Sequence, residues 1–381
     1  MDFSWSDDQQ RMRKAATDFA SRRLRDGIAE RDRDGTFSNE LWNACAEFGL
    51  QGVLIPQEHG GGGHDLLTAV AIAEGIGYGA LDNGMVFAVT AHAASCAGLL
   101  AEFGTDEQQR EWLPKLADGS VIGATGITEA NSGSNALAME TTAVSTGDRW
   151  ILNGSKTFVT NAPEAGLFLL YARTADSGLG GVTCFLVPRE SPGLSIGAPI
   201  EKMGLRTSPM SEVFLEECQV PSSSVVGAVD SGGMVFNQTM DIERLLVMAP
   251  AIGVMERILE RCVRHARERC PGAVPISKHQ SISHALADIE TSLESSRLLL
   301  YRAAWQRARK RGATRESALA KLAVSEAYVA CCRTAVQIFG GYGYMVEYGL
   351  ERELRDALAT TLYVGTSEIQ RNLIAGLRGL G

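Results

Sequence analysis

The sequence predicts an α+β protein with a helical first part, a β-rich middle part and a helical last part. Apolar residues recur with a helical period before about Val121 and again after the glycine-rich stretch 227–233. Between these regions, short segments rich in β-branched and aromatic residues alternate with turn residues. The chain has 381 residues, more than one hydrophobic core usually supports. We therefore expect three domains, at 1–119, 120–226 and 227–381.

Composition narrows the class of protein. The net charge of −9 argues against nucleic acid as a partner. The eight cysteines are scattered without a Cys-x-x-Cys pair, which argues for a reducing cytoplasm and against a disulfide framework or a metal site. No signal-like apolar run opens the chain, and no uninterrupted apolar run reaches the ~18 residues that span a membrane. We therefore expect a globular cytoplasmic protein without a membrane partner.

The first part is predicted to form five helices, at 6–32, 38–49, 65–79, 84–103 and 105–117. Ser6-x-x-Gln9 and Thr105-x-x-Gln108 are capping-box patterns that open the first and the last of them. The third and fourth segments are apolar and rich in alanine, which predicts buried helices.

The middle part is predicted to form short strands, at 141–145, 149–153, 156–160, 166–173, 181–187, 194–200 and 210–220. Asn153-Gly154 is a strong signal for a two-residue hairpin, so we expect a turn there. Several short strands at this spacing indicate a barrel or a sandwich.

The last part is predicted to form long helices, at 234–269, 279–311, 314–339 and 350–378. In the second of them, Ile282, Leu286, Ile289 and Leu293 form an apolar stripe at helical spacing. We expect these helices to pack together as a bundle.

Glycine-rich motifs near the C-terminus indicate a ligand site. Gln337-Ile-Phe-Gly-Gly-Tyr-Gly-Tyr344 is followed by Arg355-Asp356 and by Tyr363-Val-Gly-Thr-Ser-Glu-Ile-Gln370, which opens the last helix. Glycines let the backbone approach a ligand closely, and the free N–H groups of a helix N-terminus suit an anion such as pyrophosphate.

These three motifs, in this order and spacing, resemble the acyl-CoA dehydrogenase family of flavoproteins, and the resemblance covers nearly the whole chain. The segments Thr125–Asn135, Asn153–Asn161 and Lys202–Ser208 are similar to further motifs of that family. The resemblance implies N-terminal helices, a central β-barrel and a C-terminal four-helix bundle, with FAD as the cofactor.

The resemblance also implies which residues hold FAD. Those on the flavin side are Ile127, Thr128, Ser134, Phe158 and Thr160. Those on the adenine and diphosphate side are Arg269, Gln280, Gln337, Gly340, Gly341, Thr366 and Glu368. In the family, the arginine here numbered 269 reaches the FAD of a neighbouring subunit, so a homodimer or homotetramer is expected. Gly272-Ala273 departs from the Phe-Gly that the family carries after this arginine.

The catalytic base of the family is absent from its usual position. The family's Tyr-Glu-Gly-Thr reads Tyr363-Val-Gly-Thr here, so the chain is either inactive or carries its base elsewhere. Glu243 is the candidate, because it shares a helical face with the apolar Phe236 and Met240, where a carboxylate is costly unless it is paired or functional. The isovaleryl-CoA dehydrogenase branch of the family carries its base in a similar Asp-Leu-Glu-Arg sequence.

Neighbouring residues complete the predicted site. Arg244 is expected to orient the base or the loop at Val364, and Asp241 is a weaker candidate for the base. The alternative is that Glu243 forms an ion pair, for example with Arg244, at the surface of the bundle. Residues expected to contact the substrate are Ser134, Met240, Val364 and Gly365.

The resemblance predicts FAD-dependent α,β-dehydrogenation of an acyl thioester, in which a base removes the α-proton and hydride leaves Cβ. The substrate is expected to be an acyl-CoA or an acyl or aminoacyl group on a carrier protein, and the electron acceptor an electron-transfer flavoprotein or O2. Two alternatives are an oxidase or monooxygenase of the same fold that uses O2, and a non-catalytic flavin-binding homologue. The basic run Arg302–Arg315 either faces an acidic carrier protein or a CoA phosphate, or is a solvated helix end.

Overall fold

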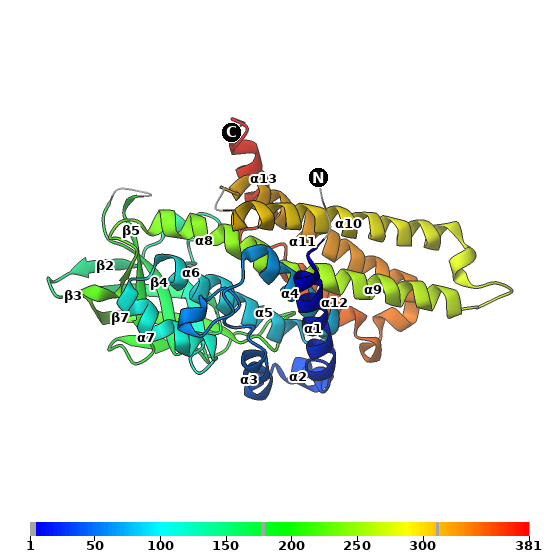
Figure 1. The fold of residues 1–381 in the computed structure, drawn as a ribbon, viewed down its shortest axis with the longest axis horizontal. Coiled ribbons are helices and arrows are strands. Elements are labelled where there is room, and N and C mark those ends of the chain that lie inside the picture. Colours follow the sequence, from blue (N-terminus) through cyan, green and yellow to red (C-terminus); the bar gives the residue numbers. More distant parts are fainter. Residues whose placement is uncertain (1–4, 177–179, 310–311, 381) are drawn as a thin grey trace.

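The computed structural model describes residues 5–176, 180–309 and 312–380, and places a β domain at one end of the long axis and a helical bundle at the other (Figure 1). The first part is helical as predicted, with helices α1 (Asp7–Arg23), α2 (Ile28–Asp34), α3 (Asn39–Glu47), α4 (Leu66–Gly79), α5 (Asn83–Ala91), α6 (Gly98–Phe103) and α7 (Asp106–Ala117). The π-helical segment η2 (His92–Ala97) joins α5 to α6. Both capping boxes are present. The expected continuous helix to residue 32 is wrong, because Gly27 has a φ of 68° and separates α1 from α2.

The middle part forms one mixed sheet in the order β6–β7–β3–β2–β4–β5–β8, with β1 parallel to β4. Its strands are β1 (Gly123–Gly126), β2 (Thr142–Ser145), β3 (Arg149–Thr160), β4 (Leu167–Arg173), β5 (Val182–Pro188), β6 (Leu194–Ile196), β7 (Met210–Pro221) and β8 (Val225–Val226). Side chains of β3, β4, β5 and β7, including Leu152, Phe168, Phe185 and Val213, meet in one internal core. The sheet therefore folds over its own core, as expected for a barrel.

The outer face of β4 and β5 is also buried, so both strands are largely apolar on both faces. Leu169 and Tyr171 of β4 share a second core with Leu99 of α6 and Leu113 of α7. This second core attaches the β domain to the N-terminal helices.

The turn predicted at Asn153-Gly154 is wrong, because both residues lie inside the 12-residue strand β3. Gly154 has a φ of 145° and pairs with Leu215 of β7 across an irregularity in the register. A Cβ at this position would lie 2.5 Å from Oγ1 of Thr141, so the glycine serves a close approach of two strands. The Asn153 amide bonds across to β7, where its Nδ2 donates to Oε1 of Glu217 at 2.7 Å.

The last part contains helices α8 (Gly232–Leu246), α9 (Ala249–Glu268), α10 (Gln280–Ala308), α11 (Thr314–Phe339), α12 (Leu350–Ala359) and α13 (Ser367–Gly376). The prediction of one helix over 234–269 is wrong, because the chain turns between α8 and α9. Pro250, in the first turn of α9, lacks an amide hydrogen and its ring would clash with the carbonyl four residues earlier. The α9 helix then crosses α4 so closely that a Cβ on Gly77 would lie 2.0 Å from the carbonyl oxygen of Pro250.

The segment 202–208 joins the three parts of the molecule. The N–H of Leu205 donates to Oδ1 of Asp356 in α12 at 2.6 Å. Nε of Arg206 donates to the carbonyl oxygen of Asp32 in α2 at 2.7 Å. This loop of the β domain is thus held by both helical parts, which fixes the orientation of the site between them.

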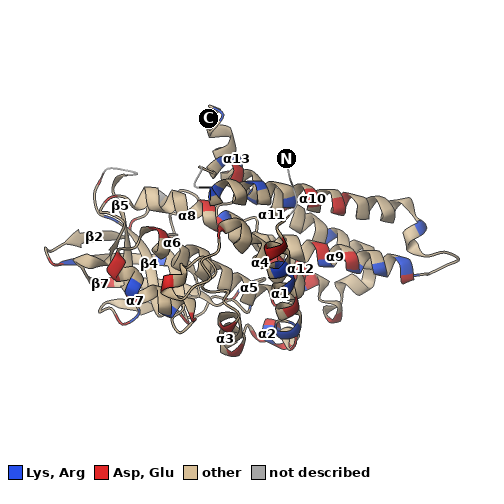
Figure 2. Ribbon diagram, in the orientation of Figure 1, with Lys and Arg blue, Asp and Glu red and all other residues tan. Residues whose placement is uncertain are grey.

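Charged side chains of both signs are spread along the outer helices, and the helices at the centre carry few (Figure 2). Two helical stretches, Asn83–Phe103 and Thr314–Tyr344, are long and apolar enough by composition to cross a membrane. Most of the first is buried inside the fold, and the helix of the second packs against α9, α10 and α13. Burial in the core accounts for the apolar character of the first stretch, whereas less than half of the second is buried.

Candidate active site

Glu243 lies in the last turn of α8 and faces the interior. The residue is buried, with only 7% of its surface exposed. Burial raises the pKa of Glu243 to about 7, while a hydrogen bond with Ser95 of η2 and the positive charge of Arg244 oppose the shift without cancelling it. A carboxylate with such a pKa can take up and release a proton near neutral pH.

Arg244 contacts Asp241 rather than Glu243. Its Nη1 lies 3.2 Å from Oδ1 of Asp241 and 3.5 Å from Oγ of Ser317 in α11. Asp241 also accepts hydrogen bonds from the hydroxyls of Ser317 at 2.9 Å and Thr314 at 3.0 Å. Among the described residues, Asp241 is therefore fully engaged and Glu243 has no ion-pair partner within 4.0 Å. The surface ion pair that the sequence left open does not form.

A small cavity separates the end of α8 from the loop that precedes α13. Its volume is about 30 Å³, and its lining includes Val247, one turn beyond Glu243, and Thr90 of α5. Phe87 of α5 and Tyr363 of the loop also line it, with ring centroids 4.6 Å apart. The cavity thus lies between α5, the start of α9 and Tyr363 of the altered Tyr-Val-Gly-Thr motif.

Val364 is half-buried and occupies the left-handed region with a φ of 55°. Gly365 follows with a φ of 84°. Nε2 of Gln370 donates to the carbonyl oxygens of both residues, at 3.2 Å and 2.9 Å. The last helix therefore fixes the loop, and its shape persists although position 364 carries no carboxylate.

The residues predicted on the flavin side lie at the edge of the β domain, around a buried ion pair. Nζ of Lys156 lies 2.6 Å from Oε1 of Glu129, and the carboxylate also accepts two backbone N–H groups. Burial lowers the pKa of Lys156 to about 8, and the charge of Glu129 opposes the shift. Lys156 therefore remains mostly protonated at neutral pH. The pair fixes the loop with Ile127 and Thr128 against β3.

Phe158 is the exposed aromatic residue of this edge. It is 60% exposed, and its φ of 56° is rare for a residue with a side chain. Thr160, two residues further along β3, is half-buried. The N–H of Thr157, directly before Phe158, donates to the carbonyl oxygen of Thr128 at 2.9 Å. Ser134 is exposed in the loop after β1. An aromatic ring held outward in a strained conformation suits contact with a flat partner.

The residues predicted on the adenine side lie at the opposite end of the molecule. Arg269 follows α9 and Gln280 begins α10, so both flank the connection at the far tip of the bundle (Figure 1). Gln337 and the pair Gly340-Gly341 are exposed at the end of α11. The Arg269 guanidinium lies 5.5 Å from the ring centroid of Tyr342. One chain therefore does not bring the two sets of predicted FAD residues together.

The N-terminus of α13 carries the remaining predicted residues. Thr366 caps the helix, where its hydroxyl accepts the N–H of Ile369 at 3.3 Å, and Glu368 is exposed. Beside them, Oγ of Ser367 and Oε1 of Gln370 are buried without a hydrogen-bond partner among the described residues. Such atoms call for a ligand partner, and a helix N-terminus suits an anion. With the outward ring of Phe158, these features fit a dinucleotide that carries a flat ring system.

Two contacts of the site were not predicted from the sequence, the Glu129–Lys156 pair and the hydrogen bond of Ser95 with Glu243. Glu129 and Lys156 both lie in motifs quoted from the sequence, and each is the only charged residue of its motif, which could have indicated that the two form a pair. Ser95 carries no comparable signal, because small polar residues are common in buried helices and only the fold brings it to Glu243.

Family models match the three parts of the chain in order, and known proteins are similar to it over nearly its whole length. Family models described as the N-terminal, middle and C-terminal domains of acyl-CoA dehydrogenase match residues 6–120, 124–218 and 230–376. An L-prolyl-[peptidyl-carrier protein] dehydrogenase of Pseudomonas fluorescens is 39% identical over 98% of this chain and 99% of its own. A mitochondrial short-chain specific acyl-CoA dehydrogenase of Rattus norvegicus is 37% identical over 96% of this chain and 89% of its own.

Solved structures give the same result. The crystal structure of the prolyl acyl carrier protein oxidase AnaB superposes with a TM-score of 0.97 at 40% identity, and covers 99% of this chain and 100% of its own. The FAD complex of PigA superposes with a TM-score of 0.98 at 34% identity, over the whole of both chains.

Proposed function

The chain belongs to the acyl-CoA dehydrogenase family, and from this premise we propose that it is an FAD-dependent enzyme that forms an α,β double bond in an acyl thioester, with Glu243 as the base. The observation that carries the proposal is the burial of Glu243 as a carboxylate without an ion-pair partner in the described structure, one helical turn before Val247, which lines a cavity together with Tyr363. The protein is an oxidoreductase of the class that acts on CH–CH bonds.

The proposed base has the chemistry that the reaction needs. The α-proton of a thioester is weakly acidic, so it requires a base in a dry site whose pKa is raised toward that of the substrate. Glu243 meets this condition, because burial raises its pKa to about 7. Ser95 would hold the carboxylate in position, and the Arg244–Asp241 pair would fix the turn of α8 that carries it.

FAD fits the residues that the fold leaves open. Phe158 and Thr160 would contact the ring system from the edge of the β domain, and the loop with Ile127 and Thr128 would bind its polar edge. The α13 N-terminus, with Thr366 and the Ser367 hydroxyl that has no partner in the described part of the chain, would hold the pyrophosphate. When bound, the flavin supplies the acceptor for the hydride that leaves Cβ.

We infer that the cofactor site is completed by a second copy of the chain. The adenine-side residues Arg269, Gln280 and Gln337 lie at the far tip of the bundle, away from the flavin-side residues of the same chain (Figure 1). Tyr344 and Val346, beside that tip, are 76% and 68% exposed, which is unusual for large side chains in a monomer. A homodimer that pairs the tip of one chain with the β domain of the other accounts for both features.

We propose a compact acyl group on a carrier protein as the substrate. Relatives that act on a prolyl group carried by a protein are 39% and 40% identical to this chain. The rings of Phe87 and Tyr363, tilted by 34° with centroids 4.6 Å apart, leave only a small cavity next to Val247, which favours a short or cyclic acyl group over a long chain.

Anaerobic mixing of the FAD-loaded protein with thioesters tests this proposal. Prolyl and other short acyl groups would be presented as carrier-protein, CoA and pantetheine thioesters, and flavin absorbance would report reduction. We expect bleaching with a compact acyl group in the wild type and at least a hundredfold slower bleaching in Glu243→Gln. Equal bleaching in both proteins would remove Glu243 from its role but keep the enzyme class.

Two further readouts distinguish the alternatives. Hydrogen peroxide formed in air at the rate of substrate oxidation would identify an oxidase, whereas turnover only with an electron-transfer flavoprotein would identify a dehydrogenase. Bound FAD that no thioester reduces would indicate a non-catalytic flavin protein, contrary to the proposal.

A further inference from the structure

Three arginines, two of them exposed and one half-buried, form a basic patch where α10 ends and α11 begins. Arg302, Arg309 and Arg315 belong to a run that the sequence singled out, whose residues 310 and 311 lie outside the described part of the chain. The Arg302 side chain is 60% exposed, and the Arg309 guanidinium lies over the ring of Trp305, 4.1 Å from its centroid. Trp305 is itself 41% exposed. We call Arg302, Arg309, Arg315 and Trp305 the α10–α11 patch.

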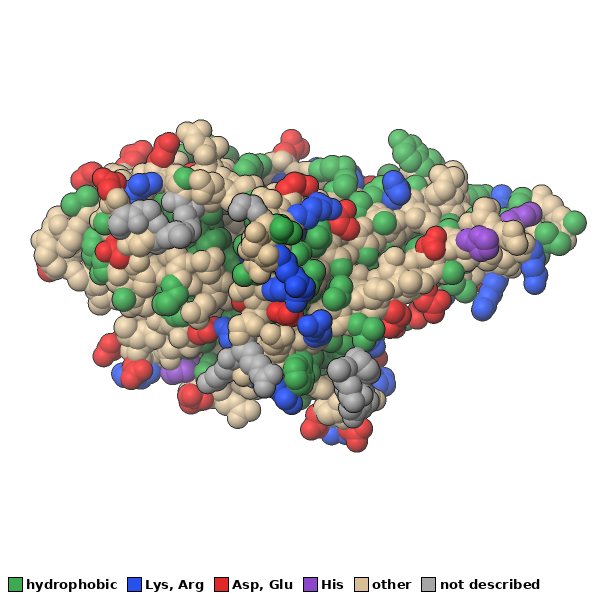
Figure 3. Space-filling view, turned by 90° about the horizontal axis from the view of Figure 1, so that it is seen from above, with side chains coloured by type: hydrophobic (Ala, Val, Ile, Leu, Met, Phe, Trp, Pro, Cys, Tyr) green, Lys and Arg blue, Asp and Glu red, His purple; other side chains and the backbone are tan. Residues whose placement is uncertain are grey.

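The charge of the patch is only partly neutralised by neighbouring side chains. Glu316 is the acidic residue in contact with it, and it lies 3.6 Å from Arg302 and 3.3 Å from Arg315. Two arginines thus share one carboxylate, and Arg309 has no ion pair within 4.0 Å among the described residues. Lys and Arg side chains gather in the middle of this face of the molecule (Figure 3). Such a concentration stands out in a protein with a net charge of −9.

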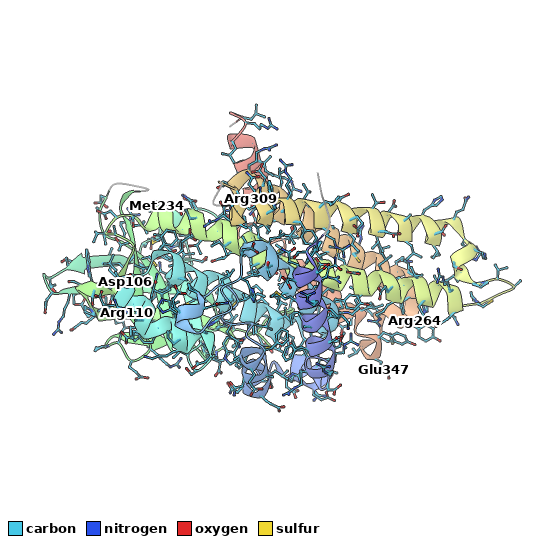
Figure 4. The ribbon with its side chains drawn as sticks, in the orientation of Figure 1. Asp106, Arg110, Met234, Arg264, Arg309 and Glu347 are labelled. Carbon is cyan, nitrogen blue, oxygen red and sulfur yellow. The ribbon has the colours of Figure 1, made fainter. Side chains whose placement is uncertain are left out.

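The patch lies across one helix from the proposed base. Thr314, directly before Arg315, donates a hydrogen bond to Asp241 at 3.0 Å, and Asp241 is two residues from Glu243 in α8. Met234, at the start of α8, is 54% exposed and lies on the same upper surface as Arg309 (Figure 4). The width of one helix, about 10 Å, therefore separates this surface from the interior that holds Glu243.

We propose that the α10–α11 patch is the docking surface for an acidic carrier protein, which delivers its acyl group to Glu243. The inference rests on the proposed function. Positive side chains steer an acidic partner and orient it, while Trp305 and Met234 provide the apolar contact that such an interface needs. An arm that starts from a carrier on this surface has only the thickness of α8 to pass before it reaches the base.

A charge-reversal experiment tests the docking surface. The variant Arg302→Glu/Arg309→Glu is compared with the wild type, and the matched control is Arg11→Glu/Arg110→Glu, whose side chains are 70% and 66% exposed on α1 and α7. Each FAD-loaded protein is assayed with the same acyl group on carrier protein, on CoA and on pantetheine. FAD content and apparent Tm confirm that each variant is folded.

We expect the KM of the patch variant for the acyl carrier protein to be raised about tenfold or more. Its KM for the pantetheine thioester should be unchanged, and the control variant should have KM values near those of the wild type. The wild-type KM for the carrier should also rise with salt, because exposed charges are screened.

An unchanged KM of the patch variant for the acyl carrier protein would overturn the docking surface. The proposed function would still stand in that case if the protein oxidises the pantetheine thioester. An equal rise with acyl-CoA would also overturn it, because the patch would then bind the phosphates of CoA. If the patch variant does not fold, the salt dependence of the wild type decides, and a flat profile refutes the inference.

Discussion

Replacing Glu243 by glutamine provides a test of the site that does not depend on knowing the substrate. Glutamine keeps the size of the side chain but is always neutral. Because burial raises the pKa of Glu243 from 4.5 to about 7, ionising it in the folded protein costs about 2–4 kcal/mol. A raised folded pKa means that the wild type loses this stability as the pH increases from about 4.5 through 7. The glutamine variant loses nothing over this range.

The variant should therefore be more stable than the wild type at high pH. For 381 residues the entropy of unfolding is about 0.8 kcal/mol per degree, so an advantage of about 2–4 kcal/mol corresponds to an apparent Tm about 2–5 °C higher at pH 8. At pH 5 the advantage should fall below about 1 kcal/mol. Differential scanning calorimetry of the FAD-loaded proteins at pH 5, 6, 7 and 8 measures both.

The same change should abolish the pH dependence of catalysis. In the wild type, kcat/KM should rise through about pH 7 as Glu243 ionises, whereas kcat/KM of the variant should be at least about a hundredfold lower at pH 8 and show no such rise. The control is Glu111→Gln, an exposed position, which should alter neither profile. A variant whose apparent Tm at pH 8 equals or falls below that of the wild type would refute the argument that Glu243 is buried as an unpaired carboxylate.

Three further changes test other parts of the structure. Lys156→Met should lower the free energy of unfolding by about 3–5 kcal/mol and release FAD, because it leaves the Glu129 carboxylate buried without its partner. The double variant that adds Glu129→Gln should recover part of the lost apparent Tm. Gly154→Ala should lower the apparent Tm, because its Cβ would lie 2.5 Å from Thr141 Oγ1, and it should do so by more than Gly147→Ala, where a Cβ meets nothing within 4 Å. Phe87→Ala should extend the range of acyl groups that are oxidised to longer chains, measured as kcat/KM across a chain-length series, and an unchanged range would separate the cavity from the acyl site.

The sequence predicted the order of helices, strands and helices because periodicity reports which faces are buried, and burial is set locally along each element. It mistook Asn153-Gly154 for a turn because the same glycine signal serves a tight turn and a close approach between strands. Only the neighbouring strand, with Thr141 against the glycine, decides between the two. The break between α8 and α9 was readable from Pro250, which the helical period of the flanking residues obscured.

The candidate site shows a similar division. Glu243 could be selected from the sequence because a carboxylate on an apolar stripe is unusual, and the structure confirms that it is buried. The partner of Arg244 could not be selected, because Asp241, Ser317 and Thr314 become neighbours only when α8 packs on α11. The segment 202–208 likewise carried no readable role, since its contacts are with helices distant in the sequence.

The placement of the predicted cofactor residues at two ends of the chain has a genetic consequence under the proposed assembly. A chain defective only at Phe158 and a chain defective only at Arg269 would each be inactive alone. A hybrid dimer of the two would contain one doubly defective cofactor site and one site built entirely from intact halves. Two inactive alleles could then complement each other in one cell, and each hybrid dimer would have up to half of the normal activity. Two alleles that are both defective on the flavin side, or both defective on the adenine side, could never do so.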